Sequence, residues 1–265
     1  MFIKTIIRNK YKSIAAILLL LLLADALTHK GIVRVLLPAS FADTAIRPVS
    51  PKEKIPFVSS GKQWKKAINT LDQVQALDPA VPGIECDVYF DTARHIFDVH
   101  HDAEKSNGLD FETLLQACRT RKLDISFWLD FKNCDTINNR AALSALEGLR
   151  DRYELKEKVL VESWNTDALS IFADSGFFTC YNVPLFNPYS AGKDSLRKWG
   201  HTISRKLAAT RISALSGYYF QYPFFKAAFP DYPVLIWSPK PSFSLADWLY
   251  RRKIGSDASV FINLE

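Results

Sequence analysis

From about residue 63 onwards, apolar and polar positions follow two alternating patterns. Short apolar runs with strand character are followed by longer segments in which apolar residues recur at helical spacing. Because strands that alternate with helices are joined by crossover connections, this order predicts a parallel sheet. The main predicted strands are Trp64–Asn69, Gly83–Phe90, Asp124–Asn133, Val159–Trp164, Phe177–Pro184, Ile212–Phe220, Val234–Pro239 and Ser259–Leu264.

The number of these units favours a closed (β/α)₈ barrel, a TIM barrel, over residues 63–265. No eighth helix is expected, because the sequence stops at Glu265, directly after the last predicted strand. An open doubly wound sheet is the alternative, although no glycine-rich phosphate turn follows the first strand. In a barrel, functional side chains lie at the C-terminal ends of the strands, so chemistry is expected there.

Residues 1–29 have a different pattern, in which four basic residues precede the ten consecutive apolar residues Ile14–Leu23. A positive flank, a short apolar core and the triplet Ala24-Asp25-Ala26 are typical of a secretory signal peptide. An uncleaved signal anchor is the alternative, because the bilayer can thin around a slightly short span. Both interpretations predict an exported protein, and the segment predicts membrane association.

Residues 30–62 mix proline, serine and charge without a sustained period, which predicts a linker before the barrel. The formal net charge of +6 comes partly from the basic N-terminus, so it indicates targeting and not nucleic-acid binding. The four cysteines match no metal-binding spacing. Strand alternation predicts that Cys86 is a buried free thiol facing away from Glu85 and Asp87.

Two neighbouring predicted strands carry charged residues at every second position. Glu85 and Asp87 share one face of their strand, and Asp130 and Lys132 share one face of the next. Neighbouring strands lie about 5 Å apart, so these four side chains are expected to meet. Three converging carboxylates repel each other unless a cation lies between them, and such oxygen ligands favour Mg²⁺ or Ca²⁺. A structural ion network without catalysis is the alternative.

A histidine follows the apolar run that begins at Ile96. His101 and Asp102 end this run, close in sequence to the acidic strand. A histidine beside a phosphate held by a metal ion is a suitable general acid or base near neutral pH. His101 is therefore a candidate for proton transfer.

The segments IECDVYFD, FDVHHD, FWLDFKN and VLVESWN resemble the superfamily of TIM barrels that contains glycerophosphodiester phosphodiesterases and phosphatidylinositol-type phospholipases C. They are most similar to its menorin-like branch, and the resemblance covers roughly residues 63–265. It implies divalent-metal ligands at Glu85, Asp87 and Asp130. It also implies a phosphate contact at Lys132 and one of two catalytic histidines at His101.

Four further positions are expected on the substrate side. The resemblance implies that Trp237 lines the substrate mouth and that Asn263 is the usual polar residue after the last strand. Asn69 is kept from the pattern at the end of the first strand. Glu162 is expected to face the same cavity from its position at a strand end alone.

The sequence departs from the family at the first histidine, because the alignment places Lys66 there. A lysine can bind a phosphate oxygen, but with an ordinary pKa of about 10.4 it is a poor proton acceptor. His100 is one candidate to replace the missing group. One hypothesis is therefore an exported metal-dependent phosphodiesterase acting on glycerophosphodiester or phospholipid head groups, with Lys66, Lys132 and His101 as catalytic residues. The other is a pseudoenzyme that binds such a head group or a partner without turnover.

The aromatic run GYYFQYPFF, residues 217–225, suggests an additional membrane-surface property. Aromatic side chains do gather at bilayer interfaces. Packing of a strand end and the following helix on the core is the alternative interpretation. A membrane-surface role would suit a lipid substrate.

Overall fold

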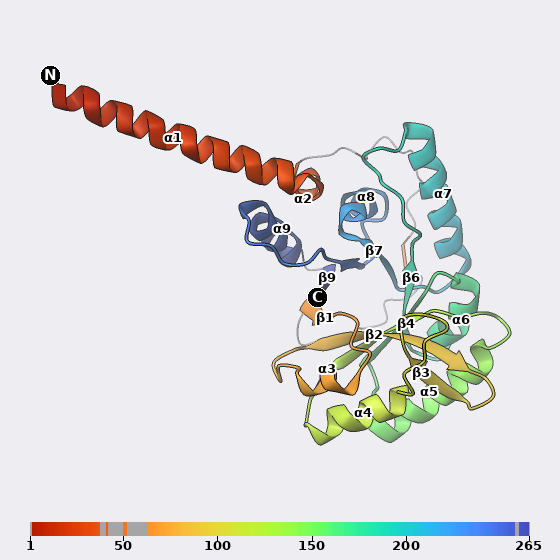
Figure 1. Cartoon of the computed structure of the whole chain (residues 1–265). Helices are drawn as coiled ribbons and strands as arrows, with labels where there is room; N and C mark the ends of the chain where they lie inside the picture. The colour runs from red at the N-terminus through yellow and green to blue at the C-terminus, as the bar shows by residue number, and fades with distance from the viewer. Residues whose placement is uncertain (1, 38–40, 42–49, 52–62, 258–259, 265) are drawn as a thin grey trace.

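A closed ring of parallel strands forms the centre of the computed structural model, which describes residues 2–37, 41, 50–51, 63–257 and 260–264 (Figure 1). Each strand pairs in parallel with the next, and β9 pairs with β1, which in turn pairs with β2. This pairing closes the sheet, so the TIM-barrel prediction is confirmed and the open doubly wound sheet is wrong. The ring consists of β1 (Gln63–Lys65), β2 (Gly83–Asp91), β4 (Ser126–Phe131), β5 (Val159–Ser163), β6 (Phe178–Asn182), β7 (Ala214–Tyr218), β8 (Val234–Trp237) and β9 (Val260–Leu264).

Each predicted strand overlaps one strand of the ring. The largest difference concerns the first, which ends at Lys65 and not at Asn69. Ala67 adopts φ +54°, and this left-handed conformation ends the extended backbone. Because β1 is short, the second half of β2 lacks a partner on that side and pairs instead with the antiparallel strand β3 (Ile96–Val99).

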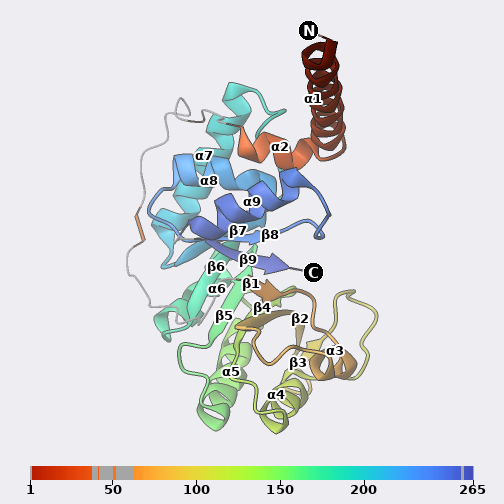
Figure 2. The ribbon, with the colours of Figure 1, turned by 90° about the vertical axis from the view of Figure 1, so that its left-hand side faces the viewer.

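Helices surround the ring, with several visible around the barrel in Figure 2. They are α3 (Leu71–Gln75), α4 (Phe111–Thr120), α5 (Asn139–Tyr153), α6 (Thr166–Asp174), α7 (Lys193–Ala209), the 3₁₀ turn η2 (Tyr219–Gln221), α8 (Tyr222–Ala228) and α9 (Leu245–Ser256). Side-chain capping fixes several of their first turns. Asp110 accepts from the backbone of Thr113 before α4, and Ser244 accepts from that of Asp247 before α9.

Strand alternation creates two separate apolar cores. The larger lies between the strands and the surrounding helices, and Cys86 is buried in it as a free thiol, as predicted. The smaller fills the inside of the ring. It comprises Trp64, Trp128, Leu160, Phe178, Cys180, Ala214 and Leu235.

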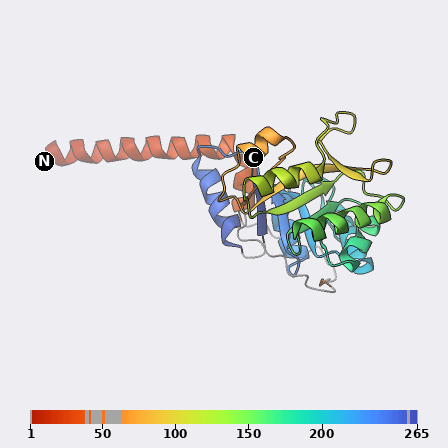
Figure 3. The same cartoon turned by 90° about the horizontal axis from the view of Figure 1, so that it is seen from below.

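The N-terminal helix α1 (Phe2–Thr28) projects from the barrel, as Figure 3 shows from below. Its segment Lys10–Thr28 is 19 residues long and has a mean hydropathy of 1.8, so it is long and apolar enough to cross a membrane. This apolar segment is not buried against the rest of the protein. Residues 30–36, which the sequence pattern assigned to a linker, form the helix α2 (Lys30–Leu36). This helix packs on α9 and buries Ile32 and Val35. Most of the remaining predicted linker lies outside the described residues.

The aromatic run at residues 217–225 belongs mainly to the core. Tyr222, Phe224 and Phe225 are buried, and only Tyr218 is more than one third exposed. These side chains cover the ring on the outside and pack against each other. Packing on the core, the alternative interpretation, therefore describes most of this run.

Candidate active site at the carboxyl ends of the strands

The three predicted carboxylates meet inside the ring. Glu85, Asp87 and Asp130 are each buried, and one oxygen from each lies within 4.8 Å of the others. The register explains this, because Asp87 and Asp130 are direct partners on β2 and β4. Two oxygens bound to one ion at about 2.4 Å can be at most about 4.8 Å apart. The cluster therefore has donors and spacing that suit a hard divalent cation.

Lys132 lies against two of these carboxylates. Its Nζ atom is 2.7 Å from Asp87 Oδ1 and 2.5 Å from Asp130 Oδ2. Burial disfavours the charged form of Lys132, but the two carboxylates outweigh burial and raise its pKa. The ammonium ion thus offsets part of the acidic charge, and three carboxylates against one ammonium leave a formal charge of −2. This surplus favours an additional cation.

The loop after β1 holds two of the acids in place. Asn69 donates from Nδ2 to Asp87 Oδ2 at 2.6 Å and accepts at Oδ1 from the Asp87 backbone N–H at 3.0 Å. The backbone N–H of Ala67 donates to Glu85 Oε2 at 2.7 Å. The left-handed conformation of Ala67 is strained for an alanine, and such strain is common at functional sites. Lys66, half-buried, is the residue just before Ala67.

His101 lies on an exposed turn above this cluster, with 70% of its side chain accessible. Its Nδ1 is 2.9 Å from Asp102 Oδ1. Hydrogen bonds from Lys105 and His101 lower the pKa of Asp102 to about 2, so the carboxylate can only accept and His101 Nδ1 must donate. The Nε2 atom is left for other chemistry. Burial raises the pKa of Asp130, while the neighbouring Lys132 lowers it.

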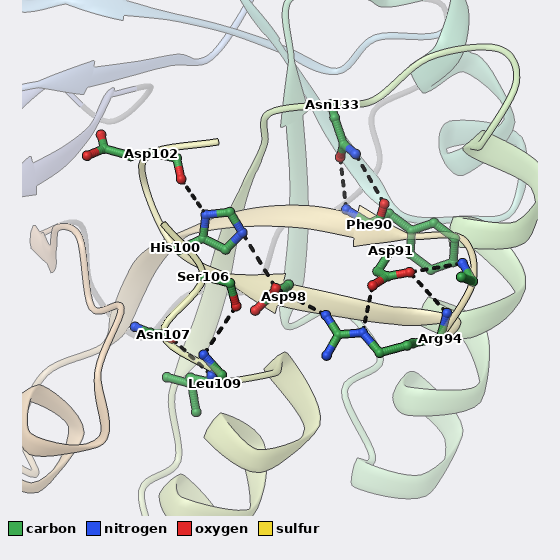
Figure 4. Close-up of polar contacts among 12 residues, drawn as sticks. Phe90, Asp91, Arg94, Asp98, His100, Asp102, Ser106, Asn107, Leu109 and Asn133 are labelled. Carbon is green, nitrogen blue, oxygen red and sulfur yellow. Dashed lines mark hydrogen bonds and ion pairs between the residues drawn. The ribbon is translucent and has the colours of Figure 1, made fainter. Parts of the chain in front are cut away.

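The ring nitrogens of His100 contact groups other than the three carboxylates. Its Nδ1 is 2.8 Å from the Asp102 carbonyl oxygen and its Nε2 is 3.6 Å from Asp98 Oδ2, as Figure 4 shows. The ring stacks on Tyr89 at 4.5 Å, and the Tyr89 hydroxyl donates to the His101 carbonyl at 3.2 Å. His100 and Tyr89 therefore support the turn that carries His101. Tyr89 was missed in the sequence, although it continues the Glu85 and Asp87 face of the strand.

The aromatic side of the mouth lies across the ring. Trp237 is half-buried, stacks on Trp128 at 6.2 Å with 19° between the planes, and meets the edge of Tyr218 at 5.4 Å. The backbone of Asn263 is in register with Trp237 and Trp64. The Asn263 side chain lies outside the described features.

Glu162 is fully buried on β5, where it is the register partner of Asp130. Neither of its carboxylate oxygens has a hydrogen-bond partner among the described residues. Burial and then the charge of Asp130 raise the pKa of Glu162 well above its usual value. Its position inside the ring agrees with the sequence expectation, but it is not one of the three acids that converge.

This protein is a closed β/α barrel. A buried acid cluster and a lysine lie near the carboxyl ends of two neighbouring strands of the barrel. Solved structures with a similar fold include a glycerophosphodiester phosphodiesterase from Parabacteroides distasonis, which is 18% identical, with 78% of this chain and 93% of that chain covered and a TM-score of 0.53. Another is a phosphodiesterase from Oleispira antarctica in complex with the product sn-glycerol-3-phosphate, at 15% identity, 76% and 92% coverage and a TM-score of 0.50. At these identities the likeness shows the fold. No protein-family model and no curated protein matches the chain.

Proposed function

We propose that this chain is a divalent-cation-dependent phosphodiesterase that acts on glycerophosphodiester or phospholipid head groups. The observation that carries the proposal is the convergence of Glu85, Asp87 and Asp130 on one point, with Lys132 against two of them. The similarity in fold to glycerophosphodiester phosphodiesterases supports it. So does the sn-glycerol-3-phosphate bound to the structural neighbour from Oleispira antarctica, because it is the product of phosphodiester cleavage in that protein.

A cation held by the three carboxylates would supply charge neutralisation to a phosphate. Lys132 uses two N–H donors on Asp87 and Asp130, which leaves the third to donate to a phosphate oxygen. Because the neighbouring carboxylates raise its pKa, Lys132 keeps its charge and stabilises negative charge that develops during reaction. Asp102 fixes the tautomer of His101, so that Nε2 is the atom that transfers a proton.

The remaining predicted residues would act on the substrate side. Lys66, in the place of a family histidine, would bind a phosphate oxygen as a point charge. Trp237 would contact the organic part of the substrate at the mouth of the ring. Asn263 and Glu162 stay candidates for the same side, and Asn69 would act by holding Asp87. We also propose that the chain is related to the menorin-like branch. The barrel would be exported and anchored in the membrane through α1.

A second candidate function is a pseudoenzyme that binds the head group without turnover. The replacement of the first family histidine by Lys66 favours it, because losing one member of an acid–base pair typically costs about 10²–10⁴-fold in rate. The cluster itself does not separate the two functions, since both need the phosphate site. Turnover is the property in which they differ.

The test is release of product from a panel of glycerophosphodiesters and lysophospholipids by the purified full chain, with and without Mg²⁺ or Ca²⁺. We expect cation-dependent turnover that falls by about 10²–10⁴-fold in His101→Ala. In Glu85→Gln, added Mg²⁺ or Ca²⁺ should no longer raise turnover, because the cation has lost a ligand. Asp91→Asn is the matched control, because Asp91 lies on the same strand but pairs with Arg94 on the hairpin. Cation and head-group binding without turnover would favour the pseudoenzyme.

A further inference from the structure

The first turns of α9 expose an apolar stripe. Leu245, Trp248 and Leu249 recur at helical spacing and are 47%, 54% and 40% exposed, and Phe243 just before the helix is fully exposed. We call these four residues the α9 patch. The opposite face of the same helix is already used for packing, through Ala246, Asp247, Tyr250 and Ile254. Large apolar side chains gathered on the outer face of a packed helix indicate a second contact surface.

The α9 patch lies next to the end of α1, and this arrangement is held by polar bonds. Asp25, near the end of α1, accepts at Oδ2 from the backbone N–H of Ala246 at 3.0 Å. Lys253 donates from Nζ to the carbonyl of Val35 at 2.9 Å, which ties α2 to the later part of α9. Figures 1 to 3 agree that α9 lies at the inner end of α1. A bilayer that holds α1 would therefore reach α9.

Charge next to the patch suits a lipid surface. Arg252 lies on the same helix, with its guanidinium 5.5 Å from the centre of the Trp248 ring, whereas the neighbouring Arg251 and Lys253 bind Asp247 and the carbonyl of Val35. Tryptophan, phenylalanine and leucine on one face, with arginine and lysine beside them, are typical of helices that lie in the membrane interface. Arg252 would meet an anionic lipid head group.

We propose that the α9 patch inserts into the interface of the same bilayer that holds α1. The barrel is then fixed to the membrane at two points, and Asp25 keeps α1 in a defined position at the start of α9. The patch begins six residues after Trp237, which lies at the mouth of the ring. Resting on the proposed function, this arrangement makes a lipid head group of that bilayer the preferred substrate over a water-soluble diester, because only the lipid substrate gains from the contact of the patch with the bilayer.

The first test needs no turnover. The full chain is reconstituted in vesicles of phosphatidylcholine and phosphatidylglycerol whose acyl chains carry bromine near the head groups, and the quenching of tryptophan emission is measured. Trp248→Phe should lose a clear part of the quenched emission. Trp199→Phe is the matched control, because Trp199 lies on α7, stacked on Phe186, and should leave the quenched part unchanged. Equal quenching in the unmodified chain and in Trp248→Phe would overturn the proposal. A dimer that buries the patch, with no quenching of Trp248 by the brominated lipid, would overturn it as well.

The second test concerns the substrate class. The double variant Phe243→Ser with Trp248→Ser should lower turnover of a lysophospholipid embedded in the vesicle by about tenfold. Turnover of a soluble glycerophosphodiester should stay unchanged, because neither residue belongs to the acid cluster. An equal loss on both substrates would contradict the inference on substrate class. If the unmodified chain turns over neither substrate, the proposed function fails while the quenching result still decides whether the patch meets the bilayer.

Discussion

Two rows of residues inside the ring are equally buried and differ completely in chemistry. The lower row, Trp128, Leu160 and Phe178, is in register across β4, β5 and β6. The upper row, Asp87, Asp130 and Glu162, is in register across β2, β4 and β5, two residues further along the two shared strands. No member of either row is more than 6% exposed.

Burial has opposite consequences in the two rows. The lower row stabilises the fold by about 25 cal/mol for each Å² of apolar surface removed from water. The upper row loses hydration, and its cost is offset only where partners exist, such as Lys132 and Asn69 for Asp87. A barrel built for stability alone would continue the apolar row upwards. The acidic row is therefore the part of the interior in which the proposed cation site would lie.

The largest expected effect is in the lower row. Trp128→Ala removes a ring that packs on Trp64 and Trp237 and should destabilise the protein by about 4 kcal/mol in urea unfolding. Its cation affinity should stay close to that of the unmodified chain once folded. Trp164→Ala, at an exposed position, should change stability by less than about 0.5 kcal/mol. If Trp128→Ala lost cation affinity as well as stability, the two rows would not be independent.

The next effect is in the upper row. Lys132→Met leaves Asp87 and Asp130 buried without their ammonium partner, which should cost about 3 kcal/mol in the presence of a chelator. Added Mg²⁺ or Ca²⁺ should restore part of this loss, because a cation replaces the missing charge. Lys158→Met is the matched control, since Lys158 pairs with the exposed Asp124 and should cost at most about 1 kcal/mol. Equal losses in both variants would contradict the special role of the upper row.

A smaller effect is expected at the loop after β1. Asn69→Ala removes both hydrogen bonds to Asp87, one of them to a buried carboxylate oxygen, and should destabilise the chain by about 2 kcal/mol. Cation affinity should fall as well, because Asp87 loses its orientation. Unfolding and calorimetric titration of the same preparation measure both. A stability loss with unchanged cation affinity would make Asn69 purely structural.

The smallest effect depends on pH. Because the pKa of Glu162 is raised in the folded state, its protonated form is favoured there, and its contribution to stability is present below the unfolded pKa of about 4.5 and is lost as pH rises through the folded pKa. With chelator present, the stability of Glu162→Gln in urea unfolding should therefore match that of the unmodified chain near pH 4 and exceed it near pH 8. Equal stabilities at both pH values would show that Glu162 keeps its ordinary pKa.

The acid cluster could be predicted from the sequence because it depends only on strand alternation and strand order. Residues two apart on a strand share a face, so Glu85, Asp87, Asp130 and Lys132 had to meet if their strands were neighbours. The closed barrel followed from the repeated strand and helix pattern. Both predictions depend on regular backbone geometry, which repeats from one residue to the next.

The rest depends on irregular backbone and on surroundings. Alanine carries no signal for a left-handed conformation, so the turn at Ala67 and its bond to Glu85 could not be predicted. The helix α2 is too short to show a sustained period. An apolar stripe such as Leu245, Trp248 and Leu249 has the same spacing whether it faces the core or the outside, so only the structure places it on the surface.

The measurement that tests the central claim most directly is calorimetric titration of the full chain with Mg²⁺ and Ca²⁺, beside Glu85→Gln and the control Asp91→Asn. We predict that one divalent cation binds per chain, with binding lost in Glu85→Gln and kept in Asp91→Asn. Absence of binding by the unmodified chain, or binding that Glu85→Gln leaves unchanged, would contradict it. Lys132 and the acids would then form a structural ion network.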